Sequence, residues 1–394
     1  MMKKTITYTF ILVLLLTLTG CWSKRETENL AITNAIGVDK INSGGKVMYK
    51  LSQVILRPRK LGMSSKSLAS GSEQTYEVVE SQGQSLEEAL QNISAEIPRI
   101  TFLAHTQVII LGQSVCVKNL NEVLDFLTRV SDIRYRSSIY VTKGNAFEVL
   151  LAKPAMESEL GKEIFGIGTY GKTQSFEVQE ITLKDFSEKI ITPGLDAWAP
   201  VLEATRSDKL KNENNLKVNG LALFKAEKLG GWLNKTDTQG FILAYGEAKQ
   251  GSLTVAIADL GQIAYLFNKS KVKISVQINQ EKRITADIIV KLSGEVVESG
   301  AYPLDDLEDF KLAETRLNQR FEEQIRSAFK QAQESESDIL GIGRLVERQD
   351  KALWDSIKEQ WPKMYAEVAI NVKVDSKIIR TGLRNKTFNG KFIK

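Results

Sequence analysis

The sequence contains few of the residues that catalytic and metal-binding sites usually require. Its 394 residues include one histidine, His105, and two cysteines, Cys21 and Cys116. A structural zinc site needs several Cys or His ligands, and these three residues argue against one. A Ser-His-Asp or Cys-His catalytic group could use only His105, which disfavours most hydrolase mechanisms. We therefore expect no metal, no cofactor and no enzymatic activity.

Strong charge of one sign and long hydrophobic runs are also scarce. The chain has 53 basic and 48 acidic residues, a formal net charge of +5, and 42% apolar residues. This composition is typical of a globular protein rather than of a disordered chain or a multi-span membrane protein. The small net charge argues against nucleic acid as a partner, since nucleic-acid-binding proteins usually show a concentrated basic patch.

The first 20 residues have the pattern of a secretory signal peptide. Lys3 and Lys4 precede a mostly apolar run from Ile6 to Leu18, which is shorter than the ~20 residues that span a bilayer. The run ends in Leu18-Thr-Gly-Cys21, which resembles a bacterial lipobox. A diacylglyceryl group on the Cys21 thiol would then hold the chain at a membrane, because two acyl chains anchor stably where one does not. The alternative is an ordinary signal peptide followed by a chance cysteine.

Hydrophobic periodicity predicts a multi-domain α+β fold with mostly antiparallel, mixed sheets flanked by helices. In the N-terminal half we expect strands at 31–38, 47–56, 102–111 and 138–142 and helices at 85–96 and 119–129. In the C-terminal half we expect antiparallel strands at 272–278, 284–292 and 368–374, with helices at 304–333 and 338–361 between the last two strands. The long helix should carry an apolar stripe made of Leu307, Phe310, Leu317, Phe321 and Phe329.

A charged, Asn-rich run at 206–215 is the best candidate for a domain boundary. It divides the chain into a signal peptide at 1–20, an N-terminal domain at 21–205 and a C-terminal domain at 206–394, with a secondary candidate boundary near 264. A Ser- and Gly-rich stretch at 62–74 is predicted to be a loop. We expect Cys116 to be a buried core residue and His105 to be a hydrogen-bonded structural histidine.

Several segments, in order along the chain, together match one family pattern. They are Cys21-Trp-Ser-Lys-Arg-Glu-Thr-Glu-Asn-Leu-Ala-Ile32, Ala35-Ile-Gly-Val-Asp39, Ala104-His-Thr-Gln-Val-Ile-Ile-Leu-Gly112, Leu124-Asp-Phe-Leu-Thr-Arg129, Gly220-Leu-Ala-Leu-Phe-Lys225, Lys228-Leu-Gly-Gly-Trp-Leu233, Asp338-Ile-Leu-Gly-Ile-Gly343, Trp361 and Val372-Lys-Val-Asp375. They resemble the spore germination lipoproteins, which are the C subunits of GerA-type nutrient receptors, Ger(x)C.

The resemblance implies a lipid-anchored subunit of a nutrient germinant receptor, required for spore germination and without enzymatic activity. Its partners would be two integral-membrane subunits, and its place the outer face of the spore inner membrane. The family's one residue of known chemistry maps to Cys21, which would carry N-palmitoyl and S-diacylglycerol groups. The alternative is a solute-binding lipoprotein of an importer, which should show two similar α/β lobes with parallel sheets. A cell-wall hydrolase is a third class, disfavoured by the lone histidine.

Overall fold

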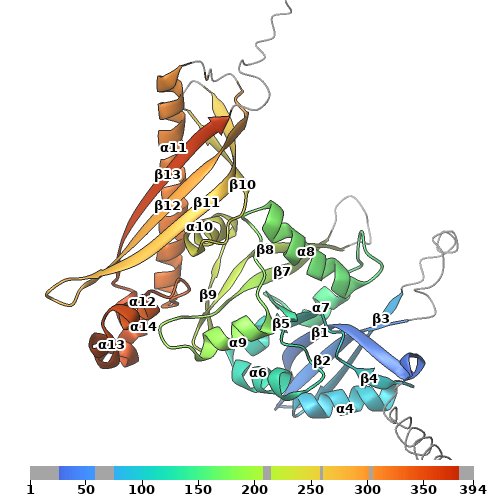
Figure 1. Cartoon of the computed structure of the whole chain (residues 1–394). Helices are drawn as coiled ribbons and strands as arrows, with labels where there is room; N and C mark the ends of the chain where they lie inside the picture. Colours follow the sequence, from blue (N-terminus) through green and yellow to red (C-terminus); the bar gives the residue numbers. More distant parts are fainter. Residues whose placement is uncertain are drawn as a thin grey trace, which may run out of the picture.

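The computed structural model describes residues 26–57, 75–206, 214–257, 261–300, 304 and 306–380. Within these ranges the chain forms one nine-stranded and one four-stranded sheet with helices packed against them (Figure 1). This confirms the predicted α+β class with mixed sheets. The predicted signal peptide at 1–20, Cys21, the predicted loop at 62–74 and most of the run at 206–215 lie outside the described residues.

The larger sheet is parallel in its middle and antiparallel at both sides. Its order is β3-β2-β1-β5-β6-β7-β8-β9, with β4 beside β1. Strands β1, β4, β5, β6 and β7 pair in parallel, whereas β1–β2–β3 and β7–β8–β9 are antiparallel. The strands are β1 (Leu30–Ser43), β2 (Lys46–Leu56), β3 (Tyr76–Gly83), β4 (Ile100–Phe102), β5 (Val108–Gly112), β6 (Ser138–Thr142), β7 (Trp198–Arg206), β8 (Asn214–Lys225) and β9 (Lys228–Leu233).

Short helices cover this sheet, and two of them were predicted from the sequence. The first follows Ser85, whose side chain accepts a hydrogen bond from the Glu88 N–H at 3.1 Å, and it ends just before Pro98. The 3₁₀ turn η1 (Thr27–Asn29) precedes β1. The helices are α4 (Leu86–Glu96), α5 (Gln113–Val117), α6 (Leu120–Arg129), α7 (Ala146–Leu150), α8 (Leu160–Gln174) and α9 (Leu183–Ile191). The predictions at 85–96 and 119–129 are confirmed as α4 and α6.

The single strand predicted at 102–111 is wrong, because the chain turns between β4 and β5. The Thr106 N–H donates to the Leu103 carbonyl at 2.9 Å, and the Gln107 N–H donates to the Asn34 carbonyl at 3.0 Å. Both strands pair with β1, and β1 itself has an irregularity between Thr33 and Ala35. The segment predicted as one strand therefore forms two, and the polar residues His105, Thr106 and Gln107 lie between them.

The smaller sheet has the order β10-β11-β12-β13. Its first three strands are antiparallel, but β13 is parallel to β12, so the antiparallel pairing predicted for 368–374 is wrong. A parallel pair needs a crossover connection, and helices supply it here. The strands are β10 (Gly251–Ala256), β11 (Gln262–Ile278), β12 (Ile284–Glu298) and β13 (Ala369–Arg380).

The crossover contains the longest described helix and a cluster of short ones. Helix α11 matches the predicted helix, and its Leu317, Phe321 and Phe329 are buried as expected, whereas Leu307 is 69% exposed because it lies at the first helical position. The stretch predicted at 338–361 is broken into several pieces. The helices of this half are α10 (Lys235–Tyr245), α11 (Leu307–Glu334), α12 (Ile342–Gln349), α13 (Lys351–Ile357), η3 (Lys358–Gln360) and α14 (Trp361–Tyr365). No helix in the described ranges is long and apolar enough to cross a membrane.

Helix α11 covers the outer edge of β13 with polar side chains spaced four residues apart. Glu314, Asn318 and Glu322 accept hydrogen bonds from the N–H groups of Ile378, Ser376 and Val374, respectively. Arg326 donates to the carbonyls of Val372 and Ile370. Four helical residues rise about 6 Å and two strand residues about 6.6 Å, so the two repeats nearly match. The helix thus satisfies an edge that would otherwise be open to pairing with another strand.

The predicted domain boundary falls between two paired strands. Strands β7 and β8 are antiparallel neighbours, and Arg206 lies opposite Asn214. The run at 206–215 therefore connects adjacent strands of the larger sheet. The division into domains at this position stays a prediction.

Candidate functional site: a buried joint beside a polar cavity

A buried carboxylate, Asp338, organises the contact between the helical crossover and the rest of the chain. Asp338 is 1% exposed, and its carboxylate accepts hydrogen bonds from the N–H groups of Ile342 at 2.8 Å and Gly343 at 2.7 Å. The Trp361 indole N–H donates to the same carboxylate at 3.0 Å. Because the first two donors lie at the start of α12, the carboxylate also meets the positive end of that helix.

Asp196, just before β7, completes the joint from the other side. Its carboxylate accepts from the Asp338 N–H at 2.7 Å and from the Ala226 N–H at 3.0 Å, and its own N–H donates to the Asp338 carbonyl at 3.0 Å. Asp196 and Asp338, with the backbone groups they bind, are called the joint below. The joint ties the start of β7, the β8–β9 turn and the start of α12 to one another.

Burial raises the pKa of both carboxyl groups of the joint. The pKa of Asp338 rises to about 7 because the group is buried, although its three N–H donors lower it, and the nearby charge of Asp196 raises it further. The pKa of Asp196 is also raised by burial, against the lowering effect of the Ala226 and Asp338 N–H groups. The joint is therefore an electrostatically costly arrangement that depends on complete hydrogen bonding.

Two glycines allow two segments of the backbone to approach closely at the joint. Gly194 has a φ of +70°, and a Cβ placed on it would lie 2.8 Å from the Gly343 carbonyl carbon. A Cβ on Gly343 would lie 2.7 Å from the Gly194 Cα and 2.9 Å from the Trp354 ring. The Arg344 N–H donates to the Gly194 carbonyl at 3.1 Å. Asp338–Gly343 and Trp361, two of the segments that carry the family resemblance, both lie at this joint.

A polar cavity of about 400 Å³ lies beside the joint. Its walls come from α8, α9 and the segments around them, including Lys172, Glu180 and Lys189, and from Trp198 at the start of β7. Tyr245 of α10 and Arg344 of α12 close it from the C-terminal half. The cavity thus lies between parts of the chain that are far apart in sequence.

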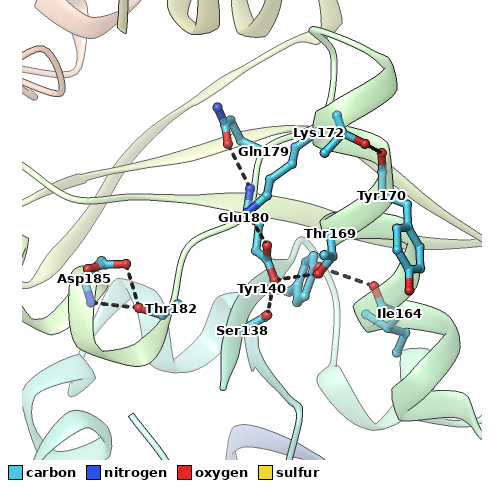
Figure 2. Close-up of polar contacts among 11 residues, drawn as sticks. Ser138, Tyr140, Ile164, Thr169, Tyr170, Lys172, Gln179, Glu180, Thr182 and Asp185 are labelled. Carbon is cyan, nitrogen blue, oxygen red and sulfur yellow. Dashed lines mark hydrogen bonds and ion pairs between the residues drawn. The ribbon is translucent and has the colours of Figure 1, made fainter. Parts of the chain in front are cut away.

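Glu180 is the most highly bonded side chain of the cavity wall. Its carboxylate accepts hydrogen bonds from Ser138 at 2.7 Å and Thr169 at 3.0 Å and pairs with the Lys172 ammonium at 2.6 Å. Figure 2 shows these three side chains converging on Glu180 from β6 and α8. The Glu180 side chain is only 9% exposed, so the cluster joins α8 to the start of β6 and leaves little of the carboxylate free for a reaction.

The charged groups of this region hold structural elements together. Lys189 donates to the Tyr245 hydroxyl at 3.0 Å and lies 5.3 Å from the ring centroid, which links α9 to α10. Within the described residues no group of three His, Cys, Asp or Glu side chains could hold a metal ion. The arrangement is that of a structural joint with an adjoining polar cavity that could admit a small polar molecule.

The residues singled out from the sequence do not meet at this site. Cys21 lies outside the described residues. Cys116 of α5 is fully buried, as predicted, and burial raises the pKa of its thiol. His105 lies in the turn between β4 and β5, where its side chain is exposed and its ring lies 5.7 Å from that of Phe102. Its expected role as a hydrogen-bonded structural histidine stays a prediction.

Another quoted segment, Ala35–Asp39, forms a second structural contact. The Asp39 carboxylate accepts from the N–H groups of Ala146 at 2.8 Å and Phe147 at 3.0 Å, at the start of α7. A Cβ on Gly37 would lie 2.9 Å from the Leu150 side chain and 3.2 Å from the Ala146 Cβ. Glycine therefore lets α7 pack directly on β1, and Asp39 fixes the start of that helix.

Sequence reasoning missed Asp196 and the Glu180 cluster. Asp196 lies in a stretch interrupted by Pro193, Gly194 and Pro200, where no periodic pattern guides an assignment. Glu180 meets partners that are 8 to 42 residues away in sequence, and ordinary Ser, Thr and Lys residues give no local signal. Only the fold brings these groups together.

Comparison with known proteins identifies the same family that the sequence segments resemble, and the matches extend along the whole chain. Residues 23–204 match the family model described as "Spore germination protein N-terminal domain", and residues 219–382 match "Spore germination B3/ GerAC like, C-terminal". Spore germination protein KC of Bacillus subtilis (strain 168) is 27% identical over 418 residues, which cover 100% of this chain and 99% of that protein. Spore germination protein B3 of the same organism is 24% identical over 404 residues, which cover 98% of this chain and 100% of that protein.

A solved structure has the same fold. The crystal structure of the GerBC protein matches with a TM-score of 0.54 and 19% identity, over 88% of this chain and 98% of that one. Fold and site together define an α+β protein of two unequal sheets whose buried carboxylates join its parts. The chain belongs to the GerAC-like, Ger(x)C, family of spore germination proteins.

Proposed function

We propose that this chain is the lipid-anchored subunit of a nutrient germinant receptor, located at the outer face of the spore inner membrane. It acts by assembling with two integral-membrane subunits and carries out no enzymatic reaction. The observation that carries the proposal is full-length similarity to spore germination protein KC, which extends over 100% of this chain and therefore includes the predicted signal peptide and Cys21.

The chemistry of the site supports a role in assembly. The carboxylates of Asp196 and Asp338 bind backbone N–H groups, and that of Glu180 is surrounded by three side-chain donors. These groups fix the shape of the body, and a body of fixed shape can bias a two-state change in a partner through the surfaces it presents.

A solute-binding lipoprotein remains the second candidate, and the cavity beside the joint is the observation that favours it. That class should show two similar lobes with parallel sheets. The described sheets instead differ in size and pairing, one nine-stranded and mixed, the other four-stranded and mostly antiparallel. Titration calorimetry of the purified chain with nutrient mixtures distinguishes the candidates, because only the second requires direct binding.

The predicted anchor can be tested at Cys21. We expect radiolabelled palmitate to be incorporated into the wild-type chain and into the control variant Cys116→Ala, because Cys116 is buried. Cys21→Ala should lose the label and leave the membrane fraction or remain uncleaved. Label that persists in Cys21→Ala would refute the assignment of the anchor.

The proposed assembly can be tested in spores. Spores lacking the chain should fail to respond to one set of nutrients and still germinate with agents that bypass receptors. The two membrane subunits should co-purify with the tagged chain from detergent-solubilised inner membranes. A normal response to every nutrient in a strain without a redundant receptor would contradict the proposal and favour the importer candidate.

A further inference from the structure

The outward face of the smaller sheet gathers lysines from three strands that are distant in sequence. The pairing registers of β11 with β12 and of β12 with β13 place nine outward residues in three rows. The rows are Lys273–Ile289–Lys373, Lys271–Lys291–Asp375 and Lys269–Ser293–Lys377. Six of the nine positions are lysines and one is acidic. We call these nine residues the lysine face.

The opposite face of this sheet is the one that packs against the rest of the chain. Residues that alternate with the lysines, such as Val290 and Val374, are buried, and α11 lies along β13 (Figure 1). All six lysines of the lysine face are exposed. Within the described ranges only Lys377 among them has an ion pair, with Glu314 at 3.3 Å and Asp375 at 3.6 Å.

This arrangement does not help the sheet to fold. Lys271 lies directly opposite Lys291 in the antiparallel pair, and like charges at directly opposed positions destabilise a sheet. The repulsion is unnecessary for solubility, since the chain has 53 basic and 48 acidic residues in total. The local concentration of charge therefore indicates a binding partner that is negatively charged.

The composition of the face identifies the kind of partner. Lysine is depleted and aromatic residues and arginine are enriched in the centres of protein–protein interfaces, whereas the lysine face has no aromatic residue and no arginine. Lysine clusters are well suited to the diffuse charge of anionic headgroups. Ile289, in the middle row position between Lys273 and Lys373, is 36% exposed and offers a small apolar contact at the centre of one row.

We propose that the lysine face binds the surface of a phospholipid bilayer that contains anionic lipids. This inference goes beyond the proposed receptor role and does not depend on the lipid anchor. The face would hold the C-terminal sheet against the membrane and so fix the orientation of the body relative to membrane partners. Oriented contact of this kind limits the surfaces that a partner can reach.

The test uses the chain from Trp22 onward, which lacks the predicted signal peptide and the thiol of Cys21. Co-sedimentation with phosphatidylcholine vesicles, with and without phosphatidylglycerol, measures the partition coefficient at low and high salt. The variant Lys271→Gln/Lys273→Gln/Lys291→Gln neutralises the centre of the face. The control Lys46→Gln/Lys118→Gln/Lys228→Gln removes the same charge from exposed lysines elsewhere.

We expect binding only to vesicles with phosphatidylglycerol, and weaker binding at high salt. Each lysine near an anionic surface contributes roughly a fivefold change in partitioning, so the face variant should bind roughly 100-fold more weakly. The control should bind nearly as the wild type does. The face variant should unfold at no lower urea concentration than the wild type, because it removes the Lys271–Lys291 repulsion. The same measurement checks that the variant is folded.

Three results would overturn the inference. One is equal binding of the face variant and the control. Another is binding that is the same for neutral and anionic vesicles, which would indicate an apolar contact. The third is binding to an acidic polypeptide or to DNA without binding to anionic vesicles, which would assign the face to a different macromolecule. Because the test protein begins at Trp22 and so lacks Cys21, none of these results bears on the proposed lipid anchor.

Discussion

Removal of the Asp338 carboxylate should be among the most destabilising single changes in this protein. In Asp338→Ala, the N–H groups of Ile342, Gly343 and Trp361 lose their acceptor inside the joint. Each unsatisfied buried donor costs about 1–3 kcal/mol, so we expect a loss of at least about 3 kcal/mol in the free energy of unfolding. The loss is a large part of the total stability of a typical domain.

The same carboxyl group should make stability depend on pH in a defined direction. Burial raises its pKa from 3.8 to about 7, so between these values the folded protein holds a proton that the unfolded chain has released. Stability from this group is therefore fully present below about pH 4 and is lost as the pH rises towards 7. The complete loss is about 4 kcal/mol, at 1.36 kcal/mol per pH unit.

Urea unfolding from pH 5 to pH 8 measures both effects. Asp338→Asn removes the titration, so the stability of the wild type relative to the variant should fall by about 1.4 kcal/mol per pH unit as the pH rises from 5 towards 7. Asp350→Asn is the matched control, because Asp350 is an exposed N-cap whose carboxylate accepts from the Leu353 N–H at 2.9 Å. Parallel pH profiles for wild type and Asp338→Asn would refute the reasoning.

Three further changes test the packing of the C-terminal half and the core. Gly240→Val should lower stability by about 3 kcal/mol or more in urea unfolding, because a Cβ at Gly240 would lie 2.1 Å from the Gln324 carbonyl oxygen and the added bulk meets backbone. Arg326→Ala should raise hydrogen exchange along β13 and lower the free energy of unfolding by about 1 kcal/mol, whereas Arg320→Ala, whose side chain bonds Glu323 within α11, should do neither. A chain without the Cys21 thiol should melt at the same temperature with and without reductant, because Cys116 is fully buried.

Secondary structure could be predicted where periodicity was strong and local. The alternating apolar residues of β11, β12 and β13 gave the right strands, and the segment after Ser85 gave the right helix. The pairing of those strands could not be predicted in the same way. A strand shows the same alternation whether its neighbour is parallel or antiparallel, and only the crossover through α11 makes β13 parallel to β12.

The candidate site could hardly be predicted from the sequence, because its residues are brought together by contacts between distant parts of the chain. Asp196 and Asp338 are 142 residues apart. The lysine face is a partial exception, since Lys269, Lys271 and Lys273 alternate within β11. The register, which the sequence does not show, places Lys291 and two lysines of β13 beside them. The net charge of the whole chain is only +5, so composition does not reveal this locally basic surface.

The position of the family segments constrains how function can be tested. Gly37 and Asp39 fix α7, and Asp338 and Gly343 form the joint, so variants at these positions should lose function by losing the folded body. Such variants cannot distinguish a subunit that acts by assembly from one that binds a solute. Surface variants can, because the lysine face and the cavity wall at Arg344 lie on different elements. A germination defect in folded lysine-face variants, with a normal response in Arg344→Gln, would locate the activity of this chain at a surface rather than at the cavity.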